Sequence, residues 1–507
     1  MDSQEPMHRD LRRLAGGTLD LIVVGGGLHG ACIAWDATLR GLRVALIERD
    51  DFGAATSANS LRIVHGGLRY LARGDLRRMR ESIRERSALL RIAPTLVQPL
   101  PVLVPTTGHG THGRLALSAA LRFNDLCSPD RNHGLDAAHR VPGGRLVSLP
   151  ECRRLFPAFP AEGASGGALW HDARLTHPER LTLAFVRAAA RQGALVANHC
   201  ALQRVLTDGG TVQGVVADDR LGSGSVQIHG RAVVVAAGPW TASLSGADPT
   251  RLPHAFALNI EVGRRLADVA AGVRSPTGAA EDPITGGRRF LFLAPQERTT
   301  LLGTWYAPAA GRSEAELVAR GAAALLGEFR AACPALELDA ADVVGYQWGW
   351  LPLKAGRERG RPDALADRPR VLAHRAAGGV RNMFSAEGVK FTTARRVAED
   401  MTDRVMAALG RAPVPCRTAD ARVDEGDLPE ATLEARVRRA VREEMAVRLP
   451  DVLRRTSPGP HAAGEGLEVV ARLAAAELGW TDQRKDAEIE AVKRSMRTPG
   501  SLPEPAA

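Results

Sequence analysis

The hydrophobic pattern near the start of the chain predicts a strand, a tight turn and a helix in close succession. An apolar run, Leu21–Val24, leads into the glycine-rich stretch Gly25–Gly30, and a mostly apolar segment, Ala31–Ala37, follows. A second apolar run, Arg43–Ile47, ends in an acid, Glu48. This order is typical of a βαβ unit, in which a helix joins two parallel strands.

The same periodicities predict further elements along the chain. Apolar positions at helical spacing indicate a basic helix over 74–92 and another helix near 179–192. Alternating segments end in an apolar strand at 231–240, and strand-like runs at 290–293 and 300–304 suit an antiparallel region.

The last part of the chain has a different, helical pattern. After a strand, turn and helix over 381–409, apolar residues recur every four positions from Leu433 to Met445. A second helix is predicted over 467–478, with Gly479 suited to its C-terminus, and Thr481 or Asp482 begins a third.

These elements predict an α/β fold: a Rossmann-type dinucleotide-binding domain interleaved with an antiparallel α+β substrate domain, plus a C-terminal helical domain. We assign 18–92, 166–240 and 345–410 to the first, 93–165 and 241–344 to the second, and 415–495 to the third.

The glycine stretch carries the clearest chemistry. It reads G-x-G-x-x-G: Gly25 permits the turn, Gly27 lets a pyrophosphate approach the backbone, and Gly30 lets helix and strand pack closely. Glu48 is placed to accept hydrogen bonds from an adenosine ribose. No second fingerprint occurs, so the motif alone leaves a nicotinamide and a flavin dinucleotide as alternatives.

Composition narrows the function classes. The chain has 507 residues, 45% of them hydrophobic, and a net charge of +10, which allows an anionic substrate, nucleic acid or an anionic membrane surface. Since 57 acids are interleaved with 67 bases, we favour a mixed solvated surface. Aromatic residues make up only 4%, too few for a nucleic-acid stacking surface, so we expect no nucleic-acid partner.

The cysteines and the hydropathy profile exclude other classes. The six cysteines are widely spaced without a C-x-x-C pair, which argues against a metal site or a disulfide framework. No run of about 18 apolar residues appears, so we expect a cytoplasmic protein. Contact with the inner face of the cell membrane stays open, through the basic helix over 74–92 or another basic face.

Five segments then occur in one characteristic order: Gly25–Gly30, Thr56–Ser57, His65–Leu71, Ala237–Trp240 and Gly388–Thr393. That order resembles the FAD-dependent glycerol-3-phosphate dehydrogenases, within the wider D-amino-acid-oxidase-like flavoproteins. The string H-G-G-L-R-Y-L is especially specific, and the resemblance covers nearly the whole chain.

The resemblance implies FAD as the cofactor, with its pyrophosphate at the first helix N-terminus. It implies that the cofactor-binding residues are Gly25, Gly27, Gly30, Glu48, Thr56, Ser57, Gly66, Gly67, Gly238 and Gly388. His65 is then the base that accepts the hydroxyl proton of the substrate, because the pKa of histidine lies near working pH. Arg69, Tyr70 and Lys390 are the other expected catalytic residues, with Arg69 and Lys390 binding the substrate anion.

Alternatives remain from the residues themselves: a structural histidine for His65 and a surface ion pair for Arg69. The chain also departs from the family. Leu351 stands where the family has an arginine before proline, and Trp305 and Tyr306 stand where it usually has Thr-Asp. Each lost arginine removes charge-assisted hydrogen bonds worth about 1.5–3 kcal/mol. Lys354, Arg357 and Arg375 are the nearby candidates to compensate.

We therefore predict an enzyme that oxidises sn-glycerol 3-phosphate to dihydroxyacetone phosphate by hydride transfer to flavin, with electrons passed to a quinone. The alternative is a related flavin oxidase or dehydrogenase acting on another anionic alcohol, hydroxy acid or amino acid. A flavin-binding partner protein with little turnover is the third hypothesis. Oxygen as electron acceptor and a homodimeric state stay open.

Overall fold

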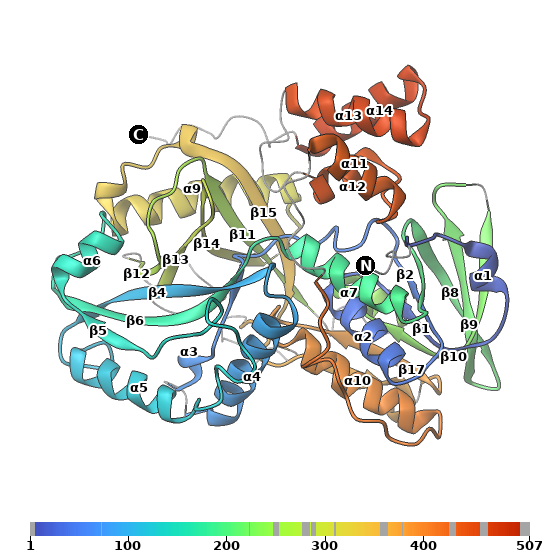
Figure 1. Cartoon of the computed structure of the whole chain (residues 1–507), viewed down its shortest axis with the longest axis horizontal. Helices are drawn as coiled ribbons and strands as arrows, with labels where there is room; N and C mark the ends of the chain where they lie inside the picture. The colour runs from blue at the N-terminus through green and yellow to red at the C-terminus, as the bar shows by residue number, and fades with distance from the viewer. Residues whose placement is uncertain are drawn as a thin grey trace. The chain divides into compact units, whose positions relative to one another are not determined.

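The structure is a computed structural model (Figure 1) that describes residues 6–71, 74–222, 224–246, 253–275, 284, 290–308, 311–354, 364–377, 379–424, 432–456 and 465–496. The chain divides into two compact units. The first unit is built from 1–58, 177–250 and 368–497, and the second from 59–176 and 251–367.

A mostly parallel sheet forms the centre of the first unit, in the order β16-β17-β10-β1-β2-β7. Its strands are β1 (Leu19–Val24), β2 (Val44–Ile47), β7 (Leu195–Ala197), β10 (Ser225–Val235), β16 (Arg370–Ala373) and β17 (Met383–Glu387). Only the β16–β17 pair is antiparallel on this path. The parallel strands are largely buried where they pair with one another, whereas the first part of β10, which pairs with β9, is partly exposed.

Three long helices of this unit lie beside the sheet (Figure 1): α2 (Leu28–Leu39), α7 (Pro178–Arg191) and α10 (Ala394–Ala408). Helix α2 contacts both of the others. An antiparallel ribbon of β8 (Cys200–Asp208) and β9 (Thr211–Asp219) extends β10. The short elements are α1 (Leu11–Ala15), η1 (Gly238–Trp240), α8 (Thr241–Leu244) and η6 (His374–Ala377).

The predicted C-terminal helices are present and have a small core of their own. They are α11 (Leu433–Arg442), α12 (Leu449–Thr456), α13 (Glu465–Leu478) and α14 (Asp482–Met496). Gly479 has a φ of 65°, as the end of α13 requires, and the Thr481 hydroxyl accepts a hydrogen bond from the Arg484 amide at the start of α14.

The second unit contains a large, mainly antiparallel sheet in the order β15-β11-β14-β13-β12-β4-β6-β3, with β5 paired to β6. Its strands are β3 (Ile63–Val64), β4 (Val97–Thr107), β5 (Arg145–Val147), β6 (Ala164–Leu175), β11 (His254–Val262), β12 (Ala270–Arg274), β13 (Phe290–Pro295), β14 (Thr300–Pro308) and β15 (Val343–Pro352). Its helices are α3 (Leu68–Leu71), α4 (Leu76–Ile92), α5 (Arg114–Leu126), α6 (Leu149–Leu155), α9 (Glu314–Ala332), η4 (Pro334–Leu336) and η5 (Ala340–Asp342).

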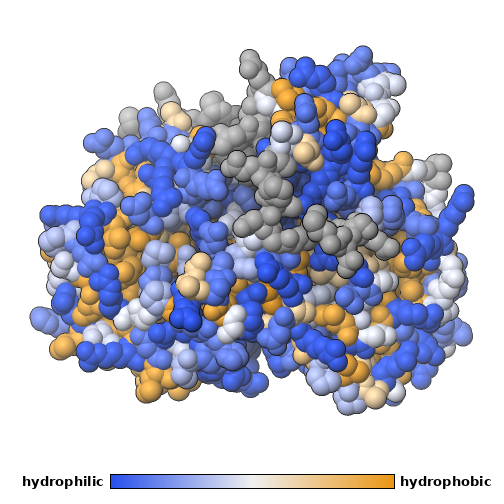
Figure 2. Space-filling model, viewed as in Figure 1, coloured by the Kyte–Doolittle hydropathy of each residue, from blue (hydrophilic) through white to orange (hydrophobic). Residues whose placement is uncertain are grey.

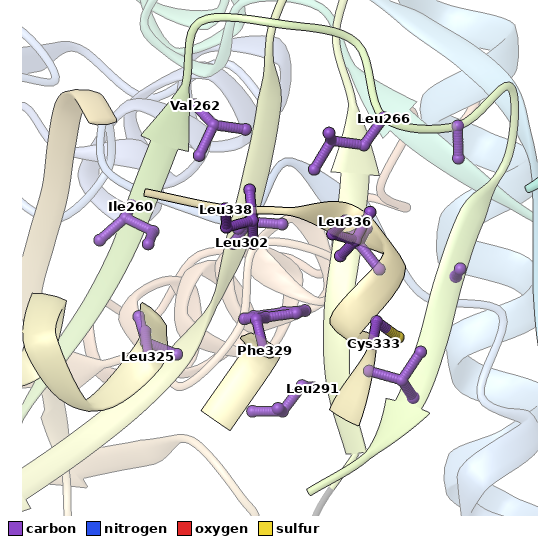
Figure 3. Close-up of a cluster of buried hydrophobic side chains, with 14 of the residues drawn as sticks. Ile260, Val262, Leu266, Leu291, Leu302, Leu325, Phe329, Cys333, Leu336 and Leu338 are labelled. Atoms are coloured by element: carbon purple, nitrogen blue, oxygen red, sulfur yellow. The ribbon is translucent and has the colours of Figure 1, made fainter. Parts of the chain in front are cut away.

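Helix α9 covers one face of this sheet and completes its core. Leu325 and Phe329 of the helix point toward Ile260, Leu291 and Leu302 of three different strands (Figure 3), and Phe329 is fully buried. A capping box begins the helix, with Ser313 and Glu316 satisfying each other's backbone amides. The second unit therefore has a hydrophobic core of its own, separate from the core of the first unit.

The observed fold class is the predicted one, but the division into units differs from the predicted boundaries. Residues 59–92 lie in the second unit, because β3 pairs with β6 and α4 packs on β4 and β6. Residues 166–176 and 345–367 also lie there, since β6 pairs with β4 and β15 with β11. The C-terminal helices join the first unit, where α12 contacts α7.

The surface is chemically mixed. Hydrophilic and hydrophobic residues are interspersed over the face shown in Figure 2, in line with the interleaving of acids and bases along the sequence. Within the part of the chain that the structure describes, no helix is both long and apolar enough to cross a membrane.

Candidate functional site

The glycine turn between β1 and α2 has the geometry that the sequence predicts. Gly25 has a φ of 106°. A Cβ there would lie 2.6 Å from the carbonyl oxygen of Ala236, the residue that follows β10. A Cβ on Gly30 would lie 1.8 Å from the Gly25 carbonyl oxygen. Both positions therefore require glycine, one for its backbone conformation and one for close packing.

Gly27 begins α2 and brings no capping side chain of its own, and the positive end of the helix dipole suits an anion. A Cβ on Gly27 would meet only the Ser57 hydroxyl, at 3.0 Å. That hydroxyl accepts a hydrogen bond from the Leu28 amide over 3.0 Å. The Ser57 hydroxyl can donate its own hydrogen to a bound anion, which is the role predicted for Ser57 at the phosphates. Thr56 is half-buried in the same loop.

Glu48 lies directly after β2, on the opposite side of the glycine turn from β10. Its Oε2 accepts a hydrogen bond from the Gly26 amide over 2.6 Å, and its Oε1 accepts one from the Asp50 amide over 2.8 Å. The surrounding protein raises the pKa of the carboxyl, and the two amide bonds oppose that shift. Glu48 thus braces the turn while it retains free lone pairs for ribose hydroxyls.

Gly238 and Gly388 follow the carboxyl ends of β10 and β17. Gly238 has a φ of 54°, and no atom lies within 4 Å of where its Cβ would be. At Gly388 the corresponding position is occupied: a Cβ would lie 1.7 Å from Nε2 of His29. The imidazole of His29, from the first turn of α2, therefore lies against the Gly388 backbone.

A buried ionic network supports the loop after Glu48. Gly53 donates its amide to the Gly26 carbonyl over 3.0 Å, so this loop contacts the glycine turn directly. Two residues earlier, the Asp51 carboxylate receives both terminal nitrogens of Arg455, from α12, over 2.6 and 2.8 Å. Arg455 also approaches Glu444, which pairs with Arg187 of α7 over 2.8 Å. The C-terminal helices thus hold the loop that braces the turn.

In the second unit, His65 pairs with a buried carboxylate. Its Nδ1 lies 3.3 Å from Oδ2 of Asp172 in β6, and the other carboxylate oxygen accepts the Gly66 amide over 2.6 Å. Burial tends to raise the pKa of Asp172, but the His65 hydrogen bond and the charge of Arg86 lower it below its ordinary value. The His65 side chain is 34% exposed, so a small molecule can reach the ring.

Gly66 and Gly67 have packing reasons of their own. A Cβ on Gly66 would lie 2.1 Å from the Arg86 guanidinium, and one on Gly67 would lie 2.9 Å from Ser82. Gly67 also has a φ of 85°. Both glycines let α4 approach the strand end that carries His65. Their predicted contact with the cofactor stays a prediction.

Arg69 and Arg78 flank the ring of Tyr70, with their guanidinium carbons 5.2 and 5.4 Å from its centroid. Arg69 also donates a hydrogen bond to the Tyr70 hydroxyl over 3.4 Å. Asp367 joins Lys354 to Arg78, at 3.4 and 3.5 Å. Asp75 also accepts a hydrogen bond from Nε of Arg78 over 2.5 Å. The structure therefore brings three cations and two carboxylates together around Tyr70, which we call the Tyr70 cluster.

The electrostatics of this cluster favour an anionic ligand. Burial tends to raise the pKa of Asp367, but the charges of Lys354 and Arg78 lower it. Desolvation by the surrounding protein lowers the pKa of Arg69, although its side chain is exposed to water; Tyr306 and Asp172 oppose the shift. Because the Arg69 side chain is exposed to water, an incoming anion can reach its guanidinium directly.

The positions at which the chain departs from the residues of the family each have a separate structural explanation. Trp305 is buried and packs on α9, where a Cβ on Gly321 would lie 2.5 Å from its ring. Leu351 is half-buried opposite Ala255 in the β11–β15 pair and brings no charge. Of the candidates to compensate, Lys354 belongs to the Tyr70 cluster. Arg375 is exposed in η6 of the other unit, and Arg357 lies outside the described residues.

Comparison with known proteins identifies the family of the chain. The family model described as FAD dependent oxidoreductase matches residues 20–404, most of the chain. The chain belongs to the FAD-dependent oxidoreductase family. A glycerol-3-phosphate dehydrogenase from Synechocystis sp. is 30% identical over 425 residues, which cover 81% of this chain and 74% of that one. This FAD-dependent oxidoreductase is therefore related to the proteins that its motifs resemble.

Two further similar proteins, one compared by sequence and one by structure, are consistent with this family. An alpha-glycerophosphate oxidase from Streptococcus pneumoniae is 30% identical over 363 residues, covering 70% of this chain and 57% of the oxidase. The crystal structure of a glycerol-3-phosphate dehydrogenase from Bacillus halodurans, complexed with FAD, has a TM-score of 0.72 at 21% identity over 98% of each chain. The latter confirms the fold.

The first unit fits FAD on its own geometry. The positive-φ turn, the open start of α2 and the carboxylate of Glu48 supply a place for a pyrophosphate and a ribose. Nε2 of His29 is buried, and within the described residues it has no hydrogen-bond partner. A bound ligand that met this atom would remove a desolvation cost of about 1–3 kcal/mol.

The predicted site residues thus fall into two sets. Gly25, Gly27, Gly30, Glu48, Thr56, Ser57, Gly238, Gly388 and Lys390 lie in the first unit, and His65, Gly66, Gly67, Arg69 and Tyr70 lie in the second. Lys390 is half-buried between β17 and α10. Sequence reasoning did not find Asp172, Arg78 as a member of the Tyr70 cluster, or His29. Only His29 had a local signal, its place inside the glycine motif.

Proposed function

We propose that this FAD-dependent oxidoreductase oxidises sn-glycerol 3-phosphate to dihydroxyacetone phosphate. The Tyr70 cluster carries the proposal, because its three cations outnumber its two carboxylates, Asp75 and Asp367, in the same unit as the His65–Asp172 pair. The names of the relatives support the substrate.

The residues of the chain divide the reaction between them. FAD, when bound, accepts the hydride from the substrate carbon. His65 accepts the hydroxyl proton at Nε2, because the Asp172 carboxylate favours the tautomer that carries its proton on Nδ1. The same carboxylate stabilises the imidazolium that results. Asp172 is therefore a positioning residue for the base.

Arg69 and Arg78 bind the phosphate in this scheme. Their forked guanidinium groups match phosphate oxygens, whereas Lys354 contributes a point charge. Asp367 keeps Arg78 and Lys354 oriented when no anion is bound. In this scheme these cations take the place of the arginine that the family has at the position of Leu351.

Anaerobic reduction of the flavin tests the proposal. Glycerol 3-phosphate should bleach the visible flavin absorbance, and Arg78→Ala should raise the substrate concentration for half-maximal bleaching at least about tenfold, the loss of one charge-assisted hydrogen bond. Arg84→Ala is the matched control, since Arg84 is an exposed arginine on the same helix. A flavin that stays oxidised with glycerol 3-phosphate but bleaches with a hydroxy acid or an amino acid would establish the alternative substrate class.

The electron acceptor is a further part of the proposal. We propose a quinone, because the Synechocystis relative is named a dehydrogenase; the oxidase name of the Streptococcus relative makes oxygen the alternative. Rates of reoxidation of the substrate-reduced enzyme by a soluble ubiquinone analogue and by dissolved oxygen separate the two. Faster reoxidation by oxygen would contradict a dehydrogenase.

For contact with a membrane surface we propose helix α5 rather than the basic helix α4. On α4, Arg80 pairs with Asp130 and Arg86 is buried against Asp172, so part of its charge is used inside the unit. On α5, Leu115 and Leu126 are 89% and 76% exposed. They are three turns apart and share one face, to which the exposed Phe123 is adjacent.

This stripe of α5 is amphipathic, because the exposed Arg122 lies between the two leucines on the same face. Its leucines suit the interface of a bilayer, and Arg114 and Arg122 suit the anionic headgroups. Co-sedimentation with phosphatidylglycerol vesicles should fall when Leu115 and Leu126 are both changed to Asp. Leu372→Asp, at an exposed leucine of β16, is the control. A second copy of the chain is the competing occupant: if light scattering shows a homodimer that the double variant dissociates, the stripe is a dimer interface.

A further inference from the structure

His29 is the polar group of the glycine turn that no role described so far uses. It lies in the first turn of α2, between the motif glycines Gly27 and Gly30. Burial lowers the pKa of its imidazole to about 4, while the charge of Glu387 opposes that shift. The ring is therefore neutral at pH 7 and carries one hydrogen-bond donor and one acceptor.

The position of the ring is fixed by its neighbours. Nε2 lies where a Cβ of residue 388 would be, so the absence of a side chain at Gly388 makes room for the imidazole. That nitrogen is buried and has no hydrogen-bond partner within the described part of the chain. Buried polar atoms are almost always satisfied, so an unsatisfied one at the edge of a ligand site points to a ligand atom.

The order of the strands indicates which half of the cofactor this atom meets. Glu48 follows β2 on one side of the glycine turn, and Gly238 and Gly388 follow β10 and β17 on the other. In a sheet of this kind the ligand runs across the carboxyl ends of the strands. With its ribose at Glu48 and its pyrophosphate at α2, an extended dinucleotide runs its other half toward β17, where His29 lies.

We propose that His29 Nε2 hydrogen-bonds to the flavin half of FAD, the ribityl chain or the isoalloxazine, and that Gly388 is glycine in order to admit the His29 ring. The inference rests on the FAD binding of the family and is independent of the substrate. A failed bleaching test with glycerol 3-phosphate would therefore leave it standing.

Titration of the flavin-stripped, full-length chain with FAD and with ADP tests the assignment. ADP carries the pyrophosphate and adenosine but lacks the flavin half. We expect His29→Ala to weaken FAD binding about threefold to tenfold, the range of one neutral hydrogen bond, and to leave ADP binding unchanged. Glu48→Ala is the matched control at the other side of the turn and should weaken both ligands. A His29→Ala variant that binds FAD like the parent, or loses ADP equally, would overturn the proposal.

Two further variants keep the test independent of folding defects. His29→Gln retains a polar group near the Nε2 position and should recover most of the FAD affinity. Gly388→Ala should weaken FAD binding in the parent, because the new Cβ displaces the ring, but should cost little in the His29→Ala background. An equal cost in both backgrounds would show that Gly388 acts without His29 and would contradict the coupling.

Discussion

Replacing Arg455 by methionine should destabilise the FAD-binding unit more than any surface change on the C-terminal helices. Arg455 forms two short hydrogen bonds with Asp51, and the two side chains are 3% and 1% exposed. Removing one partner of a buried ion pair leaves the other charge uncompensated and costs about 3–5 kcal/mol.

The neighbours of Asp51 set the expected value within that range. Asn198 donates a hydrogen bond to its carboxylate over 3.1 Å, and Arg454 lies 3.7 Å away but is 31% exposed. Both remain in the variant and partly compensate the charge, so we expect a loss near the lower limit, about 3 kcal/mol. Because the Asp51 loop contacts the glycine turn, FAD should be released at the same step.

Urea unfolding with flavin fluorescence as the signal measures both effects, since release from the protein relieves quenching. Arg438→Met is the matched control: Arg438 pairs with Glu477 over 3.2 Å on the same helices but is 58% exposed, so its loss should cost less than about 1 kcal/mol. Asp51→Leu combined with Arg455→Met should recover part of the stability, because no lone charge remains. Equal effects of Arg455→Met and Arg438→Met would refute the reasoning.

Three other outcomes follow from the structure. Asp172→Asn should slow anaerobic flavin reduction about 10²-fold or more with little change in FAD affinity, because His65 loses the carboxylate that orients it; an unchanged rate would exclude His65–Asp172 as the base. Burial opposes ionisation of Glu444, but Arg180, Arg455 and Arg187 lower the pKa of its carboxyl from 4.5 to about 2. The ionised carboxylate therefore contributes its full stabilisation of the fold above about pH 4.5, and this contribution is lost as the pH falls toward 2. In melting temperatures measured over this pH range, Glu444→Gln should reduce the fall at acid pH. Phe329→Ala should cost about 3–5 kcal/mol in the second unit while FAD titrations stay unchanged, and a matching loss of FAD affinity would contradict the independence of that core.

The glycine turn was predictable because its requirements are local. Gly25 needs a positive φ, Gly30 needs close backbone approach, and both follow from their spacing between an apolar strand and a helix. The strand, helix and C-terminal patterns were likewise recognisable from period alone. These features make up most of the first unit.

The second unit was harder to predict because its determinants are distant in sequence. Strand β4 contains Pro99, Pro101 and Pro105, which hide its strand character, and yet it pairs along its length with β6. That pairing brings Asp172 to His65, from 107 residues away. No periodicity in either segment indicates this contact, so the pair that orients the base was visible only in the fold.

The substrate side shows a second limit of motif reading. Trp305 looked like a change in the anion pocket, but its side chain is part of the α9 core. Arg78 lies within the predicted basic helix over 74–92, and only the fold shows that its guanidinium carbon is 5.4 Å from the centroid of the Tyr70 ring. A motif fixes the residue type at a position and leaves open the direction of the side chain.

The discontinuity of the first unit has a consequence for biosynthesis. Strand β1 has β10 as a neighbour, β10 has β17, and the loop beside the glycine turn is held by Arg455. The ribosome therefore releases the glycine turn well before its supports, since Arg455 is made 404 residues after Asp51. Because such long-range contacts form late and leave apolar strands exposed meanwhile, the sheet stays unfinished until those residues are made. Truncation before Arg455 should therefore impair folding of the glycine turn, which lies hundreds of residues away in the sequence.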